Sequence, residues 1–139
     1  MKIENDPISE SRQGIDKLKD TYLHWTRTQL KKLHTHIHLL ERQGLNKPGT
    51  LMTEIFDLAH NIKGLGGSFG YFLMTDIAAS LCDYVRNVEN IADMKMDVIV
   101  AHVTAMDVVI SKEIEGSGGE TGNEIIARLQ EIIEEHTKP

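Results

Sequence analysis

The chain has 139 residues, 21 of them acidic and 15 basic, and its formal net charge is −6 at pH 7. A nucleic-acid-binding protein needs a basic face, so this balance argues against that class, and the single cysteine excludes an intrachain disulfide. No apolar run approaches the roughly 18 residues that cross a membrane, and the N-terminus has no signal-peptide pattern. We therefore expect one cytoplasmic domain without nucleic-acid or membrane partners.

The first predicted helix runs from about Ser9 or Ser11 to Gln43, and Gly44 ends it. No stretch of the chain alternates convincingly with a period of two residues, so strands are not expected. The predicted buried edge of this helix consists of Ile15, Leu18, Tyr22, Trp25, Leu33, Ile37 and Leu40. A turn at residues 46–49 leads to the next helix.

The second predicted helix is capped by Thr50 and ends near Ser68. Its apolar residues recur at alternating spacings of four and three residues, which defines one buried stripe. The members of this stripe are Leu51, Ile55, Leu58, Ile62, Leu65 and Phe69. At about 100° per residue, His60 lies about 180° from the centre of the stripe and is predicted to face solvent.

The third helix is predicted from about Phe72 to Asn90, and the fourth from its cap Asp93 to about Glu115, with Gly116 as its stop. The predicted buried residues are Leu73, Ile77, Leu81, Tyr84 and Val88 in the third helix, and Met94, Val98, Ala101, Ala105, Val108 and Val109 in the fourth. Short connections between amphipathic helices favour antiparallel neighbours. We therefore predict an all-α fold, an up-down-up-down four-helix bundle over about residues 10–115.

Residues 116–122 are rich in glycine and are predicted to form a flexible linker. A C-terminal helix is predicted over about residues 123–136, and its apolar residues are Ile125, Ile126, Leu129, Ile132 and Ile133. This helix is too apolar to be a solvated tail. Either it folds back on the bundle, or it docks on a partner or a second copy.

The surface around His60 combines a cation with glycines. Lys63, three residues further on, can stabilise an anion carried on the imidazole. Gly64 and Gly67 cost helix stability, and a plausible return is clearance for the backbone of another protein. The simpler alternative is that Gly66 and Gly67 merely end the helix.

Two further residues are candidates for partner binding. Phe56 is exposed by the angular count and is predicted to be an apolar docking contact, the alternative being packing against the first helix. Arg86 is predicted on the outer side of the third helix, as a second cation for the same site.

The run His60-x-x-Lys63-Gly64, followed by small residues and Gly70, resembles the histidine-containing phosphotransfer (HPt) domain of bacterial multistep phosphorelays. The likeness continues into the next helix, where the family usually has Leu, Leu, Ala and Leu and this chain has Met74, Ile77, Ala78 and Leu81. The chain departs from the family at Leu65, where a serine or another small residue is common, and at Cys82, where a glutamate is frequent.

The resemblance implies a phosphoryl carrier and not an enzyme. His60 would accept a phosphoryl group from the aspartyl phosphate of a receiver domain and pass it to another receiver's aspartate. Lys63 would steady the phosphate, while the receiver would supply Mg²⁺, so the chain needs no cofactor of its own. The implied partners are a hybrid histidine kinase and response regulators, and we expect a monomer.

Two alternative functions remain. One is a helical interaction module that binds a receiver or regulator without carrying phosphate, and His60 beside Lys63 argues against it. The other is the dimerisation and phosphoacceptor part of a histidine kinase, which usually has an acidic residue after its histidine and a proline soon after. Here Asn61 follows, and the next proline is Pro139.

The remaining histidines and the cysteine give weaker patterns. His34 and His38 are spaced to share a metal, but no further ligands complete a site, so no metal is expected and packing at the helix edge explains them. Cys82 is expected to be half-buried rather than reactive. The isolated histidines, expected to be structural or solvated, are His24, His102 and His136.

Overall fold

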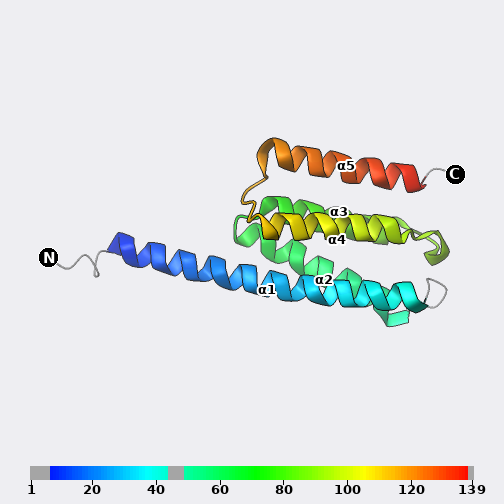
Figure 1. Cartoon of the computed structure of the whole chain (residues 1–139), viewed down its shortest axis with the longest axis horizontal. Helices are drawn as coiled ribbons and strands as arrows, with labels where there is room; N and C mark the ends of the chain where they lie inside the picture. Colours follow the sequence, from blue (N-terminus) through cyan, green and yellow to red (C-terminus); the bar gives the residue numbers. More distant parts are fainter. Residues whose placement is uncertain (1–6, 44–48, 138–139) are drawn as a thin grey trace.

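A computed structural model describes residues 7–43 and 49–137, and within these ranges it contains helices and no strand. The elements are α1 (Pro7–Gln43), α2 (Gly49–Ser68), α3 (Phe72–Asn87), the short 3-10 helix η2 (Ile91–Asp93), α4 (Met96–Ser111) and α5 (Gly119–Thr137). Helices α1 to α4 alternate in direction, and α5 runs alongside α4, antiparallel to it, and also contacts α3 (Figure 1). The predicted all-α bundle with an additional C-terminal helix is confirmed.

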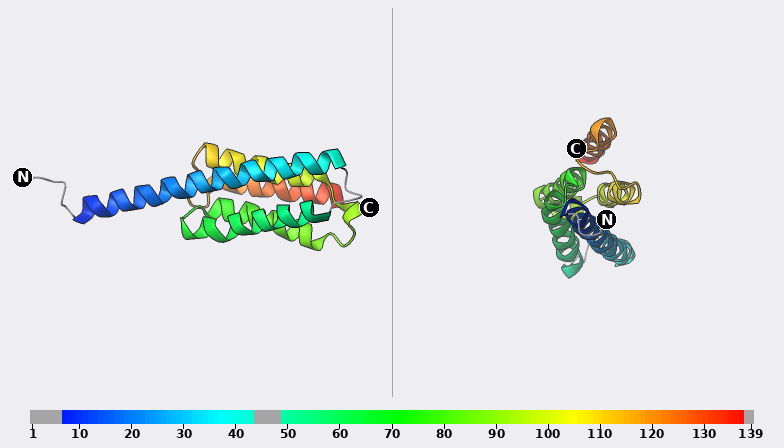
Figure 2. Two further views of the ribbon diagram at one scale, coloured as in Figure 1. Left: turned by 90° about the horizontal axis from the view of Figure 1, so that it is seen from below. Right: turned by 90° about the vertical axis from the view of Figure 1, so that its left-hand side faces the viewer.

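The four bundle helices form a ring in which α2 and α4 are diagonal. Both α1 and α3 pack against α2 and against α4, as the view along the bundle shows (Figure 2). The core between them is mainly aliphatic, and it includes the fully buried Leu33, Ile55, Ile77 and Ile99. Leu129 of α5 belongs to the same core.

The N-terminal part of α1 projects beyond the end of the bundle (Figures 1 and 2). Ile15 and Leu18 lie on this projection and are 63% and 58% exposed, so the prediction that they are buried is wrong. These two residues continue the apolar stripe of α1 beyond the point where neighbouring helices can cover it. Tyr22 is buried at the bundle end, where its ring stacks on that of Tyr71 at 4.7 Å between centroids.

The buried stripe of α2 is rotated from the predicted one. Ile55 and Ile62 are buried as expected, but Met52, Ala59 and Gly66 are also buried. The other predicted members are only half-buried, namely Leu51, Leu58, Leu65 and Phe69. The shift arises because α2 packs between α1 and α3.

The start of α2 differs from the prediction, and the predicted stop of α1 lies outside the described residues. Helix α2 begins at Gly49, so Thr50 lies inside the helix and is not its N-cap. Gly44 and most of the predicted turn, residues 46–48, lie outside the described residues.

The connection between α3 and α4 is longer than predicted. Helix α3 ends at Asn87, and Val88, its C-cap, is half-buried. Asp93 lies in η2 and does not cap α4, which begins after Lys95. Instead, the Asn90 side chain accepts a hydrogen bond from the Ala92 amide at 3.0 Å and starts η2.

Helix α4 ends earlier than predicted, at Ser111, and a structured turn follows it. Val108, predicted to be buried, is 36% exposed, and Ala101 and Ala105 are half-buried. Met94, Val98 and Val109 are buried as predicted. The other buried residues of α4 are Ile99, His102, Val103, Met106 and Ile110.

The predicted linker 116–122 overlaps α5, which begins at Gly119. The connection is tied to the α2–α3 corner, because the Gly116 amide donates to the Gly70 carbonyl at 2.7 Å and the Leu73 amide donates to the Gly116 carbonyl at 2.8 Å. A Cβ on the buried Gly122 would lie 1.9 Å from the Ser117 carbonyl oxygen, so only glycine fits there. Helix α5 folds back on the bundle, which decides between the two interpretations of this helix.

Candidate functional site

His60 lies on α2 and its side chain is exposed, as predicted. Its imidazole stacks on the ring of Phe56, one turn earlier, with 6.1 Å between centroids and 12° between planes. Phe56 is half-buried and packs against the core, so the prediction of an exposed Phe56 is wrong. The contact with His60 makes Phe56 a support for the imidazole.

Arg86 of α3 reaches the same spot from the neighbouring helix. Its guanidinium carbon lies 5.8 Å from the centroid of the Phe56 ring, within the range of a cation–π contact. Arg86 Nη1 also lies 3.7 Å from Asp83 Oδ1, in an exposed and therefore weak ion pair. The Phe56 ring is thus contacted by an imidazole from α2 and by a guanidinium from α3.

Lys63 lies one turn after His60 and is half-buried. Its backbone carbonyl accepts a hydrogen bond from Thr75 Oγ1 at 2.9 Å, which fixes this turn of α2 against α3. Among the residues that the structure describes, none forms an ion pair with Lys63. The ammonium group is therefore available to an incoming anion.

Cys82 lies on α3 and is fully buried, not half-buried as predicted. Burial raises the pKa of the Cys82 thiol, while the positive charges of Lys63 and Arg86 act in the opposite direction. The two cations of the site, on α2 and α3, therefore both favour the charged form of this buried thiol.

The glycines near His60 have different surroundings. Gly64 is exposed, and no heavy atom lies within 4 Å of a Cβ placed there, so this side of the helix is open. A Cβ on Gly67 would make an ordinary contact with Thr75 Oγ1 at 3.7 Å. Gly67 therefore tolerates a small side chain, whereas Gly64 borders open space.

Gly66 is the glycine that packing requires, and no local pattern in the sequence distinguishes it from the neighbouring glycines. A Cβ there would lie 2.6 Å from Thr75 Oγ1 and 3.1 Å from the Tyr71 carbonyl oxygen. Because α2 continues to Ser68, Gly66 and Gly67 do not simply end the helix. The close approach of α3 explains Gly66.

On the side of α2 that faces α1, a histidine–carboxylate pair joins the two helices. His36 Nε2 lies 2.6 Å from Glu54 Oε2, and His36 Nδ1 lies 2.6 Å from the Lys32 carbonyl oxygen. A shallow groove of about 250 Å³ beside this pair is lined by His36, Glu54, Asp57, Leu58 and Asn61. Sequence reasoning missed this pair, because nothing local signals a contact between residues on different helices.

Two other histidines, His34 and His102, have structural surroundings. His34 Nε2 lies 2.7 Å from Asp107 Oδ2 on α4. His102 is fully buried, where its Nε2 lies 2.8 Å from Ser80 Oγ and its Nδ1 lies 2.7 Å from the Val98 carbonyl oxygen. In the described part of the chain, no group of three or more histidine, cysteine, aspartate or glutamate side chains could hold a metal.

The described helices include none with the length and apolarity of a membrane span. Comparison with models of protein families matches residues 17–135 to the Hpt domain. Comparisons with curated proteins and with solved structures give no match. The matched region contains the whole surface around His60 and also α5 up to its last turn.

Proposed function

The chain belongs to the Hpt domain family, and from this premise we propose that His60 is the residue that carries the phosphoryl group. Hpt domains take part in phosphotransfer in phosphorelay signalling, as carriers rather than as catalysts. The observation that carries the assignment is that the exposed His60 imidazole is supported by Phe56 and has an unobstructed glycine, Gly64, beside it.

In the proposed reaction, an imidazole nitrogen of His60 attacks the phosphorus of an aspartyl phosphate on a receiver domain. The phosphorus–nitrogen bond forms as the bond to the aspartate oxygen breaks, and the aspartate leaves as a carboxylate. The reverse chemistry on a second receiver passes the phosphoryl group to that receiver's aspartate. Catalysis of such a transfer depends mainly on positioning and charge stabilisation.

Positioning is supported by the stack of His60 on Phe56, which restricts the orientation of the imidazole before the receiver arrives. Lys63 supplies positive charge from α2, one turn after His60, and Arg86 supplies it from α3, beside the Phe56 ring. Arg86 holds Asp83 only loosely, so its guanidinium can turn to a phosphate, which brings roughly −1.5 to −2 charges at neutral pH. The Mg²⁺ and the acidic pocket belong to the receiver in this proposal.

Clearance is supported by the bare surface at Gly64. The receiver must bring its phosphoaspartate to bonding distance of the His60 imidazole on the surface of α2. A side chain at position 64 would stand in that path. Gly67, a turn further on, would widen the same approach.

The partners proposed for this site are a hybrid histidine kinase, whose receiver donates the phosphoryl group, and a response regulator, whose receiver accepts it. The family membership supports phosphorelay components as partners. The proposed order of transfer, from the kinase's receiver to His60 and then to the response regulator, is the one that the resemblance of the His60 motif to the family implies.

The experiment that tests this function is incubation with a phosphorylated receiver domain and Mg²⁺, followed by measurement of acid-labile phosphate on this chain. The wild-type chain and His24→Gln should accept phosphate, because His24 is an exposed histidine on another helix. His60→Gln should not, although its fold should be retained. Acid-labile phosphate on His60→Gln would disprove the assignment.

A further inference from the structure

An aromatic side chain at the start of α3 faces solvent. Phe72, the first residue of this helix, is 53% exposed. It is the one aromatic among the large apolar side chains that are exposed in the described part of the chain. Single exposed apolar residues are common on protein surfaces, so the exposure of Phe72 matters through its position relative to the His60 site.

Phe72 lies on the same side of α3 as Arg86. The two residues are separated by about four helical turns of 3.6 residues, so their side chains leave the helix in similar directions. Arg86 reaches the ring of Phe56, on which the His60 imidazole stacks. The side of α3 that presents Phe72 is therefore the side that borders the phosphoryl site.

The pairing of α2 with α3 places Phe72 within reach of a partner that covers His60. Gly66 and Gly67 lie against Thr75, so the end of α2 is level with the start of α3. From His60 to Gly67 and from Thr75 back to Phe72, the two helix segments together rise about 15 Å at 1.5 Å per residue. A standard interface buries roughly 800 Å² on each partner, which is a disc of about 16 Å radius. A partner centred on His60 therefore reaches Phe72.

The surface between His60 and Phe72 carries short side chains. Gly64 borders open space, and a Cβ on Gly67 would contact only the Thr75 hydroxyl. Thr75 itself is half-buried. A partner can therefore lie flat on this part of α2 and α3 and contact His60 and Phe72 together, so the clearance that begins at Gly64 continues towards the α2–α3 corner.

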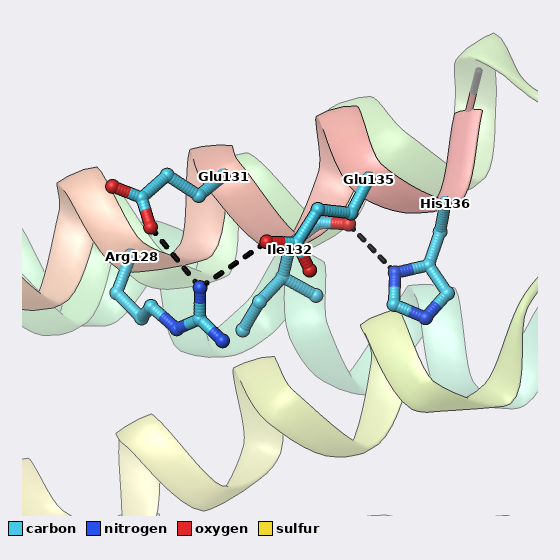
Figure 3. Close-up of polar contacts among 5 residues, drawn as sticks. All are labelled: Arg128, Glu131, Ile132, Glu135 and His136. Carbon is cyan, nitrogen blue, oxygen red and sulfur yellow. Dashed lines mark hydrogen bonds and ion pairs between the residues drawn. The ribbon is translucent and has the colours of Figure 1, made fainter.

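The α5 side of the molecule offers a phosphorylated partner the opposite charge. Helix α5 carries five glutamates against one arginine. That arginine, Arg128, is already paired, because its Nη1 lies 3.0 Å from Glu131 Oε2 and 3.4 Å from Glu135 Oε1 (Figure 3). An aspartyl phosphate is anionic, so this surface repels it, whereas Lys63 and Arg86 attract it to α2 and α3.

We infer that Phe72 is the apolar anchor of the receiver domain that exchanges phosphoryl groups with His60, and that the receiver lies along α2 and α3 from His60 to the corner. This inference rests on the proposed function. Aromatic side chains are enriched at the centres of protein interfaces, where they bury large apolar areas. The receiver must then present an apolar side chain opposite Phe72, at a distance from its own phosphorylated aspartate. Phe72 thus takes the docking role that the sequence suggested for Phe56, whose ring supports the imidazole instead.

Kinetics of transfer from a phosphorylated receiver test the anchor. Phe72→Ser should raise the KM for the receiver by about tenfold and leave kcat near the wild-type value, because the lost contact is equally present before and during transfer. Phe72→Leu keeps an apolar side chain and should stay close to the wild type. Val108→Ser is the matched control, since Val108 is an exposed apolar residue on α4, the helix diagonal to α2, and this variant should transfer as the wild type does.

Phosphoramidate separates docking from the reactivity of the acceptor. This small donor phosphorylates an imidazole directly, with loss of ammonia, and needs no docking surface. Phe72→Ser should take up acid-labile phosphate on His60 at the wild-type rate, measured against His60→Gln as the blank. A slower reaction would show that Phe72 acts through the fold or the imidazole and would overturn the inference.

The receiver measurement also distinguishes the inference from the proposed function. An unchanged KM for the receiver in Phe72→Ser would overturn the inference and leave the assignment of His60 intact. A wild-type chain that accepts no phosphate from the receiver would overturn the proposed function, and the inference with it. Circular dichroism of each variant checks that the helical fold is intact.

Discussion

At the scale of single residues, the site is defined by what lies against His60. Phe56 stacks on the imidazole, and the Arg86 guanidinium reaches the Phe56 ring from α3. Lys63 adds a second cation from α2 itself. A phosphoryl group on His60 would thus meet positive charge from two helices, and a rigid apolar support would limit where the imidazole can point.

Lys63→Met separates the charge of this residue from the bulk of its stem. We expect slower phosphoryl acceptance and a shorter-lived phosphohistidine, with receiver binding less affected. The effect should be moderate, because an exposed ion pair contributes about 0–1 kcal/mol and Arg86 shares the role. Transfer rates and phosphohistidine lifetimes at low and moderate salt measure it. Identical values for both proteins would show that Lys63 is an ordinary surface residue.

Phe56→Leu tests the support under the imidazole. Leucine keeps an apolar side chain at this half-buried position but removes the flat ring that stacks on His60 and Arg86. We expect receiver binding to be nearly unchanged while the rate of transfer falls, because the loss concerns orientation. If transfer and binding weakened equally, Phe56 would instead be a docking contact.

His102 makes stability depend on pH. Burial lowers its pKa from the ordinary value of 6.5, and the hydrogen bond to the Val98 carbonyl only partly opposes this. Since the unfolded state then binds the proton more readily, this contribution to stability is complete above pH 6.5 and is lost as pH falls towards the folded-state pKa. Chemical denaturation between neutral and mildly acidic pH measures the loss, with a slope of at most about 1.4 kcal/mol per pH unit for one proton.

His102→Gln is the control for that measurement, because it removes the buried imidazole and leaves every other titratable side chain in place. The wild type should lose more stability than the variant on acidification. Parallel pH profiles would show that His102 is not the responsible group.

At the scale of elements, the α2–α3 corner determines how close the two helices of the site come. Gly66 permits the contact with Thr75 and Tyr71, while the Thr75 hydroxyl donates to the Lys63 carbonyl. The turn of α2 that carries Lys63 is therefore fixed by α3. The glycines at 64 and 66 are two positions apart, yet one serves access from outside and the other serves packing inside.

This contrast gives opposite expectations for two substitutions. Gly64→Gln should stabilise the fold by up to about 1 kcal/mol through helix propensity, and it should slow phosphoryl transfer by obstructing the receiver. Gly66→Ala should destabilise the fold by about 1–3 kcal/mol, because its methyl group has no room. Thermal denaturation and transfer kinetics of both variants test the pair. Normal transfer by Gly64→Gln would remove the steric role of this glycine.

At the scale of the whole molecule, α5 is part of the fold rather than an appendage. Its connection is hydrogen-bonded to the α2–α3 corner, and Leu129 is buried in the common core. At this same end of the bundle, α1 continues beyond the other helices, with Ile15 and Leu18 exposed (Figure 1).

Leu129→Ala should lower the free energy of unfolding by about 2–4 kcal/mol, as expected for a large-to-small change in a core. Hydrogen exchange of the dilute protein shows which helices lose stability. We expect the amides of α5 to lose protection before those of α2. Unchanged protection in α5 would mean that other contacts hold this helix.

The sequence by itself determined the helical class, the exposure of His60 and the family motif, because helical periodicity and the spacing of His60, Lys63 and Gly64 are local properties. The tertiary structure alone decided which periodic residues are covered. Ile15 and Leu18 are exposed because their helix extends beyond the bundle, and Phe56 is half-buried because it packs against the core. It also decided that Gly66 is the packed glycine and that α5 folds back. Each of these depends on distances between helices, which no local pattern encodes.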